Sequence, residues 1–187
     1  MIIDIISDVC ASLSKRMDQQ INYIYGDSSY IRETLLLLGK SRVTASGKFP
    51  MIGLYVPLDE ERDSENYFCK ASVNIIIATN TLEKYTNEQR REISFEGILR
   101  PLYYGFIEEL KKCDKFDFGY SGIVSHTYSE NYSFGRRGAV DVDGKEVGEK
   151  IDAIEIKNLD LTVKNQNCYA NLSLIHISEP TRRRGIS

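Results

Sequence analysis

The stretch FCKASVNIIIA, residues 68–78, decides the fold of this chain. Apolar and polar residues alternate along it, so that one face of an extended strand would carry Cys69, Ala71, Val73, Ile75 and Ile77. Successive side chains of a β-strand point to opposite faces of the sheet, and the pattern therefore indicates a strand with one buried face. Upstream, an apolar run at residues 49–56 and the acidic, polar run PLDEERDSEN at residues 57–66 predict the partner strand and the loop of a hairpin.

The closing apolar stretch, AIEIKNLDLTV at residues 153–163, predicts the last strand, but its apolar positions change parity. They are even-numbered at Ile154 and Ile156 and odd-numbered from Leu159 onward. A strand with one buried face cannot change parity unless an extra residue is inserted. We therefore expect a β-bulge near Lys157 and Asn158.

Two stretches have the spacing of amphipathic helices. Apolar residues recur at helical intervals over residues 2–19, and again from residue 86 to about residue 112. Thr86 followed by Gln89 is a capping box that marks the start of the second helix. Pro101 lacks an N–H, and its ring crowds the carbonyl group four residues earlier. The sequence therefore predicts a kink or break in this central helix.

Shorter elements complete the pattern. Residues 21–25 and 123–134 are candidate strands, and a short helix capped by Asp27 or Ser28 should end at Gly39. The order of elements predicts an α+β fold. We expect a mainly antiparallel sheet of about four strands, with the N-terminal helix and the kinked central helix packed on one face.

Residues 172–187 differ in origin from the rest of the chain. The segment LSLIHISEPTR is the translation of a transposase-type adapter used to prepare short-read DNA libraries, and the remaining RRGIS fits the index and flanking bases that follow it. Translated adapter is excluded from reasoning about the fold. We therefore expect residues 1–171 to form a single α+β domain and residues 172–187 to take no part in it.

Composition limits the classes of function. The chain has 24 basic and 27 acidic residues, and residues 1–171 have 21 and 26, a net charge of −5. This sign argues against a nucleic-acid binder that neutralises phosphates. No apolar run approaches the ~18 residues of a membrane span. We therefore expect neither a specific nucleic acid nor a membrane as a partner. The N-terminus lacks the features of a secretory signal, so we do not expect secretion either.

No constellation of residues predicts a catalytic, cofactor or metal site. His126, the sole histidine of residues 1–171, is predicted to be structural, because no Ser-His-Asp or Cys-His set can be assembled around it. The segment DVDG at residues 141–144 lacks the remaining ligands of an EF-hand loop and is predicted to be a turn. The cysteines are widely spaced, form no CxxC pair and suggest free buried thiols in a reducing compartment: Cys10, Cys69, Cys113 and Cys168.

Two charged segments are candidate contacts with a partner or a second copy. One is the acidic segment with Asp59, Glu60 and Glu61, and the other is the basic pair Arg136 and Arg137. Each also has a simpler interpretation, since acids keep a strand edge soluble and a loop arginine pair is often only solvated. The chain has 12 tyrosines and no tryptophan, which favours contact surfaces because tyrosine is enriched at interfaces.

Three stretches together resemble a known group of proteins: KFPMIGLYVPLDEER, the run from CKASVNIIIATNT through EQRREISFEGILRPLYYGFIEEL, and IDAIEIKNLDLTV. They are similar to small phage and prophage proteins of gut bacteria. The order of elements resembles the tail-terminator and tail-completion proteins of long-tailed phages. The resemblance rests on layout and hydrophobic pattern over most of residues 1–167.

The resemblance implies a non-enzymatic structural protein of the virion, assembled in the cytoplasm of the bacterial host. In that family, subunits form a hexameric ring that caps the tail tube and joins it to the head. The implied partners are further copies of the chain, tail-tube proteins and head-connector proteins. A monomeric binding module or regulator encoded in a mobile element is the alternative, and an enzyme ranks last.

Overall fold

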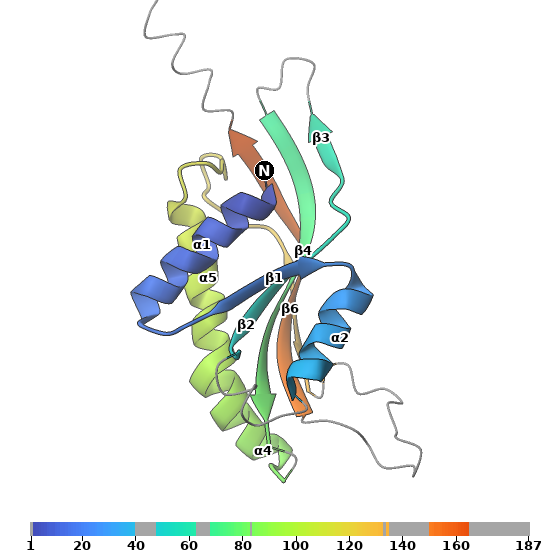
Figure 1. Cartoon of the computed structure of the whole chain (residues 1–187). Helices are drawn as coiled ribbons and strands as arrows, with labels where there is room; N and C mark the ends of the chain where they lie inside the picture. Colours follow the sequence, from blue (N-terminus) through green and yellow to red (C-terminus); the bar gives the residue numbers. More distant parts are fainter. Residues whose placement is uncertain are drawn as a thin grey trace, which may run out of the picture.

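The computed structural model describes residues 2–39, 48–62, 68–82, 84–132, 134 and 150–164 (Figure 1). The predicted adapter segment and the predicted domain end at residue 171 lie outside these residues. Helices and strands follow one another as α1 (Ile2–Met17), β1 (Asn22–Gly26), α2 (Ser28–Gly39), β2 (Met51–Tyr55), β3 (Glu60–Arg62), β4 (Phe68–Thr81), α4 (Asn87–Arg90), the π-helix η1 (Arg91–Leu99), α5 (Arg100–Lys112), β5 (Thr127–Asn131) and β6 (Lys150–Lys164).

The α+β fold is confirmed, with a sheet of six strands rather than about four. The strand order is β1-β2-β4-β6-β5. Strand β3 pairs with the same edge of β4 as β2 does, but with the first half of β4 instead of the second. All pairs are antiparallel except β1 with β2, which makes the sheet mixed. Helix α2 connects β1 to β2, and parallel neighbours require such a crossover. The segment at residues 57–66, expected to be a hairpin loop, contains the short strand β3.

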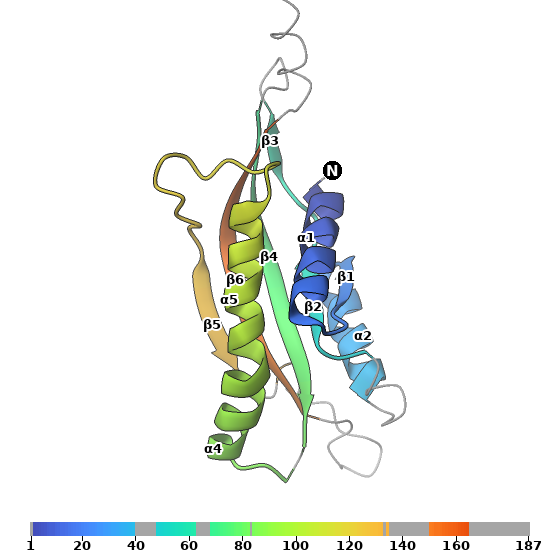
Figure 2. The ribbon, with the colours of Figure 1, turned by 90° about the vertical axis from the view of Figure 1, so that its left-hand side faces the viewer.

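The predicted buried face of β4 is confirmed. Helix α1 covers this face together with the continuous helix that η1 and α5 form, as Figures 1 and 2 show. Gly105 lets the two helices approach closely, because a Cβ there would lie 2.8 Å from a Leu13 methyl group. The core beneath them includes Val73, Ile75, Ile77, Phe95, Leu102, Phe106, Ile154, Ile156 and Leu161.

The central helix changes form where Pro101 was expected to disturb it. The nine residues of η1 form a π-helix, and Arg100 donates its N–H to the carbonyl of Phe95, five residues earlier. Pro101 then opens α5, where a missing N–H is tolerated. The disturbance is therefore a run of widened turns instead of a sharp break, and Figure 2 shows a continuous helical rod.

The predicted bulge is confirmed in β6. Val73 pairs with Leu159, but Ile75 pairs with Ile156, so β6 contains one residue more than β4 at this point. Asn158 has φ +52°, in the left-handed region, which asparagine tolerates better than most residues. The extra residue lets Ile156 and Leu159 both face the core.

Helix α2 corrects the expectation that helices cover only one face. Ile31 and Leu35 of α2 are buried in a second cluster with Ile76 and Ala78, whose side chains point away from the main core. Asp27 Oδ1 accepts the N–H of Tyr30 at 2.8 Å and caps this helix, as predicted. The second face is thus covered at one end by α2, and beyond it β4 presents exposed polar side chains at Lys70, Ser72 and Asn74.

Candidate functional site

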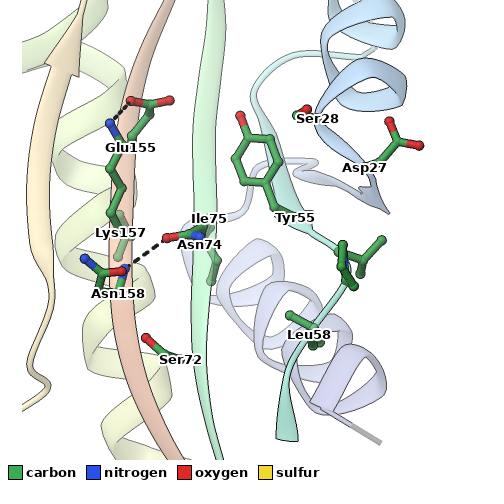
Figure 3. Close-up of a pocket in the computed structure, with 13 residues that line it drawn as sticks. Asp27, Ser28, Tyr55, Leu58, Ser72, Asn74, Ile75, Glu155, Lys157 and Asn158 are labelled. Carbon is green, nitrogen blue, oxygen red and sulfur yellow. Dashed lines mark hydrogen bonds and ion pairs between the residues drawn. The ribbon is translucent and has the colours of Figure 1, made fainter.

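A pocket of about 650 Å³ lies on this second face, beside the start of α2 (Figure 3). The bulge of β6 and the connection between β2 and β3 form its sides. Its polar lining comes from residues far apart in the sequence, and Figure 3 shows how they surround the opening: Asp27, Ser28, Tyr55, Ser72, Asn74, Glu155, Lys157 and Asn158. Apolar side chains at Val56, Pro57 and Leu58 complete one wall.

Four of the polar residues of this pocket are bonded in two pairs. Asn74 Oδ1 accepts the backbone N–H of Asn158 at 3.0 Å, which satisfies the bulge residue. Glu155 forms an ion pair with Lys157 at 2.7 Å and accepts a hydrogen bond from Asn131 Nδ2 at 2.6 Å. The Glu155 carboxylate is therefore engaged by partners on two different strands.

Tyr55 contributes a phenol to the lining of the same pocket. Burial, together with the nearby charge of Glu155, raises the pKa of the Tyr55 phenol to about 12. The phenol therefore stays protonated at neutral pH, where it is able to donate or accept a hydrogen bond but does not act as a base.

A second candidate site is a cluster of aromatic rings where α5 passes β5, here called the tyrosine surface: Tyr103, Tyr104, His126 and Tyr128. The Tyr103 ring centroid lies 4.8 Å from that of Tyr128 and 5.1 Å from that of Tyr104, both in edge-to-face geometry. Such pairs are favoured by the ring quadrupoles. Tyr104 is 62% exposed and Tyr128 is 39% exposed, so the cluster presents aromatic area to solvent.

His126 has a defined role in this surface. Its Nδ1 lies 2.8 Å from the carbonyl oxygen of Val124, which can only accept, so Nδ1 carries the proton. In the neutral ring, Nε2 is then the acceptor for the Tyr103 hydroxyl, also at 2.8 Å. The histidine therefore orients a tyrosine ring, and this geometry supports the predicted structural role.

An ion pair borders the tyrosine surface. Arg100 of α5 donates from Nε to Glu130 Oε1 at 2.7 Å and from Nη2 to Oε2 at 3.2 Å. Tyr128 donates its hydroxyl to the same carboxylate at 2.5 Å. These bonds, led by that from Arg100, hold the pKa of Glu130 below its ordinary range despite partial burial. The charge beside the aromatic rings is thus already compensated.

The predicted charged contacts are only partly visible. Asp59 and Glu61 are exposed, and Glu60 and Glu61 lie in β3. Glu60 is paired with Arg62 of the same strand, and the bond from Arg62 lowers the pKa of the Glu60 carboxyl. Arg136 and Arg137 lie outside the described residues, so their pairing with the acidic segment stays a prediction.

A buried ion pair that the sequence pattern did not predict joins Arg90 and Asp152. Their side chains are 4% and 0% exposed, and two hydrogen bonds join them, one of 3.1 Å from Nε to Oδ2. The Arg90 guanidinium also lies over the Tyr132 ring, 5.2 Å from its centroid. A signal was available, because Asp152 interrupts an otherwise apolar stretch of the last strand.

No protein-family model matches the chain, and no curated protein matches its sequence.

Within the described residues, no group of three or more His, Cys, Asp or Glu side chains is placed to hold a metal ion. Among the described helices, none has the length and apolar character needed to cross a membrane. Cys10, Cys69 and Cys113 are free thiols, and burial raises the pKa of Cys10 to about 12.

Proposed function

We propose that the chain is a non-enzymatic structural subunit of the tail-terminator or neck type. Copies of it would assemble into a ring that caps a phage tail tube or joins it to the head, with tail-tube and head-connector proteins as further partners in the virion. The observation that carries the proposal is the tyrosine surface on α5 and β5. Aromatic rings supply large contact area with few rotatable bonds, and interfaces are enriched in them.

The electrostatics of the tyrosine surface also favour a contact role. Covering an unpaired charge is costly, because the charge loses its hydration without gaining a partner. Glu130 is already bonded to Arg100 and Tyr128. A partner could therefore cover the exposed rings without leaving this carboxylate unpaired.

The charged segments belong to the same proposal. Asp59 and Glu61 are exposed carboxylates, and Arg136 and Arg137 of a neighbouring subunit would pair with them. Contacts of this kind at the rim of an interface set register and partner choice more than affinity.

Light scattering of the full chain over a range of concentrations, alone and with a tail-tube protein, tests the proposal. A defined oligomer that Tyr104→Ala weakens, and that the exposed-loop control Tyr120→Ala leaves unchanged, is the expected result. A strict monomer under both conditions would reject the assembly function. It would favour the alternative, a monomeric binding module that uses the pocket of about 650 Å³ beside α2.

A further inference from the structure

The edge strand β1 has backbone groups directed away from the sheet. Asn22 donates its N–H to the carbonyl of Pro50 at 3.1 Å, and Gly26 accepts the N–H of Val56 at 2.9 Å. The N–H and C=O of one residue point to the same side of a strand, and this side alternates from residue to residue. Those of Tyr23 and Tyr25 therefore point outward, and no described residue hydrogen-bonds to them.

Beside this edge lies a groove that encloses about 510 Å³. Ile3, Asp4 and Ser7 of α1 line one side, and Tyr30 of α2 lines the other. Figures 1 and 2 show that β1 lies between these two helices. The Tyr23 hydroxyl donates to the carbonyl of Ile3 at 3.1 Å and holds β1 against α1. The edge is thus recessed, with room beside it for an extended chain.

The β1 edge lacks the charged residues and the proline that often protect an edge strand. Natural sheets use charged residues or proline to prevent pairing with another chain. The strand β3, an edge of the same sheet, follows this rule with the sequence EER, whereas β1 reads NYIYG and has neither charge nor proline. The β1 edge is therefore chemically open to pairing with another strand.

We propose that this occupant is strand β5 of a second copy, which adds to β1 and continues the sheet from one subunit to the next. The two strands form the opposite ends of the sheet, and each has five residues. Figure 2 shows β5 as the outermost strand on the side away from β1, so that a protruding edge meets a recessed one. If the β1 edges of two copies paired with each other, the helices that flank them would instead be brought against each other.

The side chains of the two strands are compatible with this pairing. Tyr23 and Tyr128 both lie on the helix-covered face, since Tyr23 bonds to α1 and Tyr128 packs against Tyr103 of α5. Aromatic residues on one face of adjacent strands stabilise their pairing. The contact uses two different patches of each subunit and is therefore heterologous, as ring closure requires. The inference rests on the proposed function and names its interface.

Cross-linking between copies tests the pairing. Tyr25→Cys and Tyr128→Cys are made separately in the full chain, in a Cys113→Ser/Cys168→Ser background. The two variants are mixed and treated with a short bis-maleimide, which tolerates a shift of register. A covalent dimer that forms in the mixture, but neither with one variant alone nor with the Tyr120→Cys control, is the expected result. The double variant Tyr25→Cys/Tyr128→Cys should give a ladder of multimers.

Light scattering of the same samples separates the possible failures. Oligomers without any cross-link in the mixture would overturn the β1–β5 contact and leave the proposed assembly function standing. Cross-linking of Tyr25→Cys with itself would overturn the contact in favour of a symmetric β1–β1 dimer. Monomers of the unsubstituted chain as well as of the variants, without cross-links, would reject both the contact and the proposed function.

Discussion

Removing one member of the buried ion pair should cost far more than removing both. Asp152→Leu leaves the Arg90 guanidinium buried without its carboxylate, and breaking such a pair costs about 3–5 kcal/mol of the free energy of unfolding. The structure favours this range, because the side chains are 4% and 0% exposed and two hydrogen bonds join them. For a domain of ordinary stability, about 5–15 kcal/mol, this is a large fraction.

The double replacement Arg90→Met/Asp152→Leu should lie within about 1 kcal/mol of the original protein or be more stable, because apolar side chains of similar size avoid the cost of burying charges. The single variant Arg90→Met should lose about 3–5 kcal/mol near neutral pH.

Urea denaturation of the four proteins in this double-mutant cycle gives the coupling free energy. We expect a coupling of at least about 3 kcal/mol. Single losses that simply add, within about 0.5 kcal/mol, would refute the reasoning, because they would show that the two side chains do not depend on each other.

Three further predictions concern the core, the bulge and the tyrosine surface. Val73→Ala should lower the free energy of unfolding by about 1–4 kcal/mol, because it opens a cavity at a fully buried position; an unchanged urea midpoint would contradict the assigned face of β4. Asn158→Ala should cost about 1 kcal/mol more than Asn158→Gly, because the φ of +52° suits glycine, and equal stabilities would count against the bulge. The Arg100 guanidinium lowers the pKa of Glu130, so its stabilisation is present at neutral pH and is lost as the pH falls from about 5 to about 2. Glu130→Gln should therefore lose less stability over that interval, and an identical acid-unfolding curve would exclude this contribution.

Local pattern was sufficient for much of the fold. The alternation over residues 69–77 identified the buried face of β4, and the change of parity identified the bulge at Asn158. Thr86 and Gln89 marked the start of the central helix through a capping box, which the structure contains. These features depend on residues close together in the chain, whose side-chain direction follows from the period of the helix or strand.

Only the tertiary structure decided which elements meet. A period shows that a face is buried but not what covers it, so the position of α2 on the second face could not be derived from its sequence. The parallel pairing of β1 with β2 depends on how the α2 crossover returns to the sheet. Arg90 and Asp152 are 62 residues apart, and Tyr103 lies 23 residues from His126. Strand register and helix placement bring such side chains together, and neither is encoded in the spacing of nearby residues.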